Sequence, residues 1–90
     1  MAFRTLPTPR AHASPARFNS ALAAFRNANR NVAARSTRSN RAAFSRSVDR
    51  LLATPAPNVL ALVAKMEAVD PFDLDQFEVV LGDARRLAGL

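Results

Sequence analysis

The sequence contains no cysteine, no tryptophan and no tyrosine, and only two glycines among its 90 residues. The lack of cysteine excludes disulfide bonds, cysteine zinc ligands and thiol catalysis. Because both glycines, Gly82 and Gly89, lie near the end of the sequence, there is no glycine-rich phosphate-binding loop. No apolar run approaches the roughly 18 residues that indicate a transmembrane helix. We therefore expect no transmembrane helix and none of these common site types.

Alanine and arginine dominate what remains. Alanine is the residue that costs least in helical geometry, so its abundance predicts helices rather than strands. Ninety residues form at most one small domain, and 49% apolar residues are enough for a core. The composition thus predicts an all-α fold, a small bundle of about four helices.

The positive charge is concentrated in the first half of the chain. Residues 1–50 carry ten arginines and one acid, Asp49, whereas residues 51–90 carry three basic and six acidic residues. Such a split predicts a basic arm or face attached to a mildly acidic module. Twelve arginines against one lysine suit bidentate contact with phosphate. The same bias is typical of proteins from GC-rich genomes, so both explanations stay open.

Apolar residues at helical spacing predict helices at about 15–35, 41–53, 57–69 and 74–88. They form one domain over 14–90, after a flexible basic tail at 1–13. The first two form an antiparallel hairpin, and the last two are shorter. The expected caps are Ser14, either Ser39 or Asn40, Asp73 with Gln76, and Gly89.

The segment Thr54-Pro55-Ala56-Pro57 predicts a rigid corner between the second and third helices. Proline cannot donate the helical hydrogen bond, and it pushes the preceding residue out of the helical region. Thr54 and Pro55 therefore end the second helix, and Pro57 falls in the first turn of the third. The main inward face that we predict for the third helix comprises Val59, Leu62, Val63 and Met66, and Leu60 and Val69 widen it.

Catalytic chemistry finds little support in these residues. The only histidine, His12, lies in the tail without a nearby acid, and no base is placed to activate a serine. Asp70, Asp73 and Asp75 lack the glycine and distal glutamate of a calcium loop, and helix capping explains them better. We predict no enzyme, no cofactor, no metal and no small-molecule substrate.

The arginines between residues 26 and 50 are the strongest functional signal. They suit contact with nucleic-acid phosphates, although they surround the hairpin more than they form one face. The sequence has no helix-turn-helix signature with its short glycine turn. The candidate polyanion-binding residues are Arg26, Arg30, Arg35, Arg38, Arg41, Arg46 and Arg50.

The stretch from Leu51 to Asp73, "LLATPAPNVLALVAKMEAVDPFD", resembles small uncharacterised helical proteins of alphaproteobacterial genomes and prophages. Their pattern continues into a last helix ending in Asp-x-x-Arg-Leu, which here is the run from Asp83 to Leu87. Asn58 replaces the acid expected after the second proline. The resemblance covers residues 48–88 and implies no biochemical activity, while its relatives are more acidic in the first half.

The leading hypothesis is a non-catalytic interaction or accessory protein of bacterial or prophage type, cytoplasmic, with a protein partner or self-association. The first alternative is phosphate-backbone binding of nucleic acid through the arginine-rich half. The second is an organellar protein, because residues 1–48 have the acid-free, Arg-, Ala- and Ser-rich composition of a mitochondrial presequence.

Overall fold

The computed structural model describes residues 14–70 and 72–90, and over these residues it contains four helices and no strand. The helices are α2 (Pro15–Ala34), α3 (Arg38–Ala53), α4 (Val59–Ala68) and α5 (Leu74–Leu87). The predicted all-α bundle of four helices is confirmed. The predicted flexible tail, with His12, lies outside the described residues.

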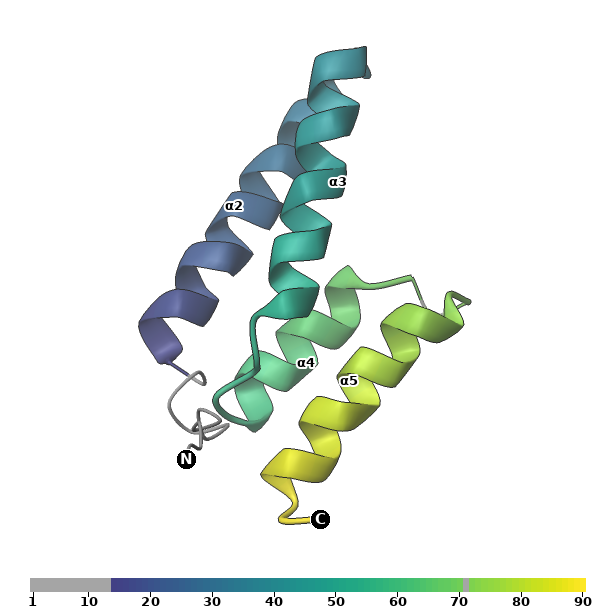
Figure 1. The fold of residues 1–90 in the computed structure, drawn as a ribbon. Coiled ribbons are helices and arrows are strands. Elements are labelled where there is room, and N and C mark those ends of the chain that lie inside the picture. The colour runs from purple at the N-terminus through teal and green to yellow at the C-terminus, as the bar shows by residue number, and fades with distance from the viewer. Residues whose placement is uncertain (1–13, 71) are drawn as a thin grey trace, which may run out of the picture.

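The helices form two antiparallel pairs (Figure 1). α2 and α3 make the long hairpin, and α4 packs mainly on α5. The shorter pair lies beside the half of the hairpin where α2 begins and α3 ends, so the end that contains the α2–α3 turn projects beyond it. No helix in the described part of the chain is long and apolar enough to cross a membrane.

The core lies where the two pairs meet and contains few large side chains. Phe18, Leu51, Leu62 and Val80 are its large buried members, and Ala21 and Ala56 fill the space between them. Phe25 and Phe44 continue the packing along the hairpin, with ring centroids 5.6 Å apart. All four large members are among the helix-spaced apolar residues from which the helices were predicted.

The α2–α3 turn is shorter than expected, because α3 begins at Arg38 and not near residue 41. Its N-cap is Thr37, whose Oγ1 accepts a hydrogen bond from the Asn40 backbone N–H at 3.0 Å. Asn40 instead closes the end of α2, since its Nδ2 donates to the carbonyls of Asn31 and Arg35. The prediction of Ser39 or Asn40 as the cap is therefore wrong.

The start of α4 also differs from the prediction. Its N-cap is Asn58, whose Oδ1 accepts from the Ala61 backbone N–H at 2.8 Å, so Pro57 lies before the helix and not in its first turn. An asparagine is among the best N-cap residues, and it sets this boundary two residues after the predicted one.

α5 is capped at the predicted residues, Asp73 and Gly89. The reciprocal bond of a capping box does not form, because Gln76 Oε1 accepts from the Asp70 N–H at 2.8 Å and not from the Asp73 N–H. Asp73 Oδ1 accepts from the backbone N–H groups of Asp75 and Gln76. At the other end Gly89 has a φ of 80°, and the Leu90 N–H donates to the Arg85 carbonyl at 2.8 Å. This is the Schellman arrangement, in which a glycine adopts the left-handed conformation that other residues disfavour.

Candidate functional site

Lys65 on α4 is the most deeply buried charged side chain, with 0% of its surface exposed. Its Nζ donates to the backbone carbonyls of Leu52 at 3.1 Å and Thr54 at 2.9 Å, and to Asp83 Oδ2 at 2.7 Å. An ammonium group has three donors, and here each has an acceptor. Lys65 thus ties the end of α3 and the proline corner to α5.

Arg86 completes this buried network from the next turn of α5. Its Nη2 donates to the carbonyl of Ala56, a fully buried residue between the two prolines. The same nitrogen lies 3.4 Å from Asp83 Oδ1. Thr54 closes the corner locally, because its Oγ1 donates to the Arg50 carbonyl at 2.7 Å. The corner formed by Thr54, Pro55 and Pro57 is therefore held by side chains from two other helices.

The Lys65–Asp83 pair at the centre of this network is closed off from solvent. Lys65 has no exposed surface and Asp83 only 8%, so neither side chain reaches a molecule outside the bundle. Helical periodicity alone did not predict this pair. One signal was present, since Lys65 is the only basic residue of α4 and the rest of that helix is apolar apart from Glu67.

The structure does not bring the seven candidate arginines to one face. Arg26 lies on the side of α2 toward α4, and Arg30 lies one turn beyond it on α2. Arg46 and Arg50 line a groove on the opposite side of the hairpin. The other three surround the projecting turn: Arg35, Arg38 and Arg41.

All eight arginines of the hairpin, Arg17 included, are exposed. Among the described residues, the ion pairs are Lys65–Asp83 and Arg86–Asp83, so none of the eight is within 4.0 Å of a carboxylate. Three of them bond neutral acceptors: Arg30 donates to Asn27, Arg41 to Ser36, and Arg50 to Ser20 across the hairpin. Since a guanidinium has five donors, each retains capacity for another acceptor.

The outward side of α4 is apolar, which corrects the predicted helix face. Of the four residues expected to point inward, only Leu62 is buried. We define the α4 outer face as Val59, Leu60, Val63 and Met66, which are 64%, 81%, 45% and 51% exposed. Lys65 is the reason for the difference, because its bonds to α3 and α5 turn its own side of α4 inward.

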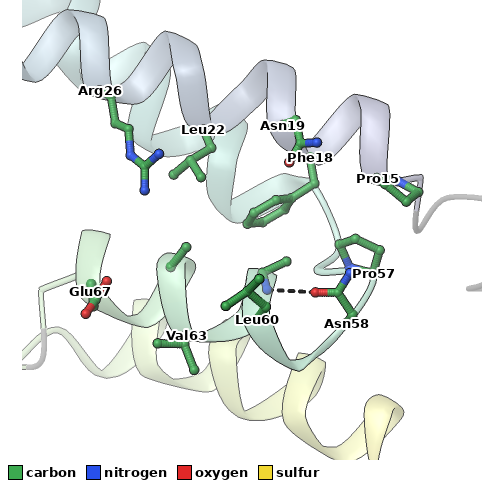
Figure 2. Close-up of a pocket in the computed structure, with 12 residues that line it drawn as sticks. Pro15, Phe18, Asn19, Leu22, Arg26, Pro57, Asn58, Leu60, Val63 and Glu67 are labelled. Atoms are coloured by element: carbon green, nitrogen blue, oxygen red, sulfur yellow. Dashed lines mark hydrogen bonds between the residues drawn. The ribbon is translucent and has the colours of Figure 1, made fainter.

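A groove of about 510 Å³ separates α4 from α2, and α5 lies on the far side of α4 (Figure 2). Phe18 and Leu22 extend from α2 toward α4, and Leu60 and Val63 border the opposite wall. Arg26 and Glu67 stand at the same end of the groove, one on each helix. The groove is thus lined mainly by apolar side chains, with Asn19 and Asn58 among them and charged side chains at one end.

Within residues 14–70 and 72–90, no three histidine, cysteine or acidic residues cluster in a way that could hold a metal ion. The chain matches no family model, no curated protein and no solved structure. The features that bear on function are the α4 outer face, the groove and the arginines of the hairpin.

Proposed function

We propose that this chain is a non-catalytic interaction protein that binds a protein partner through the α4 outer face. The observation that carries the proposal is the exposure of all four of its large apolar side chains on one short helix. A helix that is apolar on both sides is normally covered on both sides. In α4 only one of the two apolar sides is covered by the rest of the fold. The single exposed charged residue of this helix is Glu67.

Exposed apolar residues are common singly, but a contiguous group favours an interaction surface. Val59, Val63 and Met66 follow one another at spacings of four and three, so they form a stripe along α4, with Leu60 beside it. The buried bonds of Lys65 on the other side hold this stripe outward. A preformed apolar stripe on a fixed helix suits a partner that supplies its own apolar surface. The accessory role of bacterial or prophage type belongs to this same proposal.

Capture from a nuclease-treated lysate, followed by mass spectrometry, tests the proposal with matched variants. We expect the Leu60→Glu/Val63→Glu variant to recover roughly tenfold less of the wild-type partner, because each carboxylate would be desolvated in the interface. The control, Phe72→Glu/Leu74→Glu, adds the same charge at apolar side chains that are 90% and 78% exposed, and should retain the partner. Equal recovery by the wild type and the α4 variant would reject the proposal.

Binding of nucleic-acid phosphates is the second candidate function. The observation that favours it is the set of eight exposed hairpin arginines, none of them paired with a carboxylate in the described part of the chain. Unneutralised arginines release counterions from a nucleic acid when they contact its phosphates. The projecting turn presents Arg35, Arg38 and Arg41 away from the acidic α4–α5 pair.

For this candidate we expect affinity for a fluorescent DNA duplex to fall steeply as salt rises from about 50 to 200 mM. Arg35→Ala/Arg38→Ala/Arg41→Ala should reduce the slope of log K against log salt by about 3, since each lost phosphate contact removes roughly one unit. Arg85→Ala is the control, because Arg85 is exposed on α5. Fluorescence anisotropy gives both slopes, and no binding at the lowest salt would eliminate this function.

A further inference from the structure

The groove between α2 and α4 has a specific shape and charge. Its walls are two helices, whose backbone groups are already hydrogen-bonded within each helix. An extended strand laid between them would find no free backbone partners, whereas a helix satisfies its own. The accessible apolar lining provided by Leu22, Leu60 and Val63 suits the apolar side of such a helix.

The charges along the groove indicate which helix it accepts. Arg26 lines the groove, and Arg30 follows it one turn later on the same flank of α2. Both are exposed, and neither forms an ion pair with a carboxylate of the described residues. On the α4 side the only charged lining residue is Glu67. The α2 side therefore attracts acidic side chains.

We propose that the groove between α2 and α4 binds an amphipathic helix of a partner protein, apolar side inward and acidic residues against Arg26 and Arg30. This inference rests on the proposed function and names the partner's chemistry. The occupant is a different protein and not a second copy of this chain. If α5 of one copy entered the groove of another, the two copies would meet through different surfaces, which is a head-to-tail contact. Such contacts produce rings or open filaments.

Three synthetic helices test the inference. Each has about 16 residues, or roughly four turns, with leucines at spacings of three and four on one side. They differ only in the flank, which carries glutamate, glutamine or lysine. At about 50 mM salt, where surface charges are weakly screened, we expect the glutamate helix to bind at least about fivefold more tightly than the lysine helix. Amide shifts in ¹⁵N spectra should centre on Leu22, Arg26, Ala61 and Ala64.

The charge reversal Arg26→Glu/Arg30→Glu should invert this preference in favour of the lysine helix. Arg46→Glu/Arg50→Glu is the matched control, since it changes the net charge equally on the opposite side of the hairpin. Each pair also removes one side-chain hydrogen bond, Arg30 to Asn27 or Arg50 to Ser20. The control should keep the preference for glutamate.

The inference is overturned by an absence of binding, by equal affinity for the three flanks, or by amide shifts centred outside the groove. A dimer in solution that Arg26→Glu/Arg30→Glu dissociates would also overturn it, because the occupant would then be a second copy. The capture experiment separates this failure from that of the proposed function. A partner lost by Leu60→Glu/Val63→Glu but retained by Arg26→Glu/Arg30→Glu rejects the groove and keeps the α4 outer face.

Discussion

Replacing Asp83 with asparagine should lower the free energy of unfolding by about 3–5 kcal/mol, the cost of leaving a buried charge without its counter-charge. The Lys65 ammonium has no exposed surface and lies 2.7 Å from Asp83 Oδ2. Asparagine retains a polar side chain but removes the negative charge that balances this cation. In a chain of this size such a loss corresponds to a fall in melting temperature of roughly 12–40 °C.

Lys65→Met should also lower the free energy of unfolding, but for a different reason and with a smaller electrostatic contribution. Asp83 would still have Arg86 beside it, at 3.4 Å, so no carboxylate is left without a cation. The loss comes from the carbonyls of Leu52 and Thr54, which lose their donor at about 1–3 kcal/mol each where they stay dry. The double variant Lys65→Met/Asp83→Leu should cost less than the two single changes together, because it leaves neither charge of the pair behind.

Thermal and urea denaturation followed by circular dichroism measure these differences. Asp49→Asn is the matched control, since Asp49 is exposed on α3, and it should change stability by no more than about 0.5 kcal/mol. A cost below about 1 kcal/mol for Asp83→Asn would show that the pair contributes only what a surface salt bridge does.

The Lys65–Asp83 pair also explains how one helix with two apolar sides acquires a single orientation. Leu62 and Val63 are neighbours in sequence and similar in chemistry, yet Leu62 is 9% exposed and Val63 is 45% exposed. Hydrophobic burial alone discriminates weakly between two apolar sides. A lysine that must reach two carbonyls and a carboxylate fixes the rotation of α4, which in turn decides which residues face a partner.

The orientation of α4 is the feature of the fold that could not be predicted from the sequence. The helices follow from local features, because capping residues such as Ser14 and Asp73 and the proline corner act on their immediate neighbours. The outward side of α4 depends on a contact between residues 18 positions apart, which helical periodicity does not encode. The pattern was misleading here, since Val59, Val63 and Met66 have the spacing of a buried stripe but lie outside.

The arginines illustrate the same limit on the hairpin. The charge distribution along the sequence predicts that the first half of the chain is basic, and in the structure all eight arginines of the α2–α3 hairpin are exposed. Their distribution over two flanks and a turn depends on how α2 rotates against α3. Phe18, Ala21 and Ala28 set that rotation by being buried, so Arg26 lines the groove toward α4 and Arg30 follows it one turn later. The rotation of α2 therefore decides that Arg26 lines the groove, which the number of arginines alone does not indicate.

Phe18→Ala should be the most damaging change in the apolar core, with a loss of about 3–5 kcal/mol in the free energy of unfolding. Phe18 is 1% exposed and is the largest fully buried side chain of the described residues. The core has only three other large buried apolar residues, Leu51, Leu62 and Val80, so little can collapse into the space left behind. Small domains have total stabilities of about 5–15 kcal/mol, and the variant loses a large fraction of that.

The matched control is Phe72→Ala, which removes the same ring from a side chain that is 90% exposed and should change stability by no more than about 0.5 kcal/mol. Urea denaturation of both variants gives the comparison. Phe18→Leu should recover part of the loss, because it refills the site with an apolar side chain. Similar stabilities for Phe18→Ala and Phe72→Ala would contradict the placement of the core between the two helix pairs.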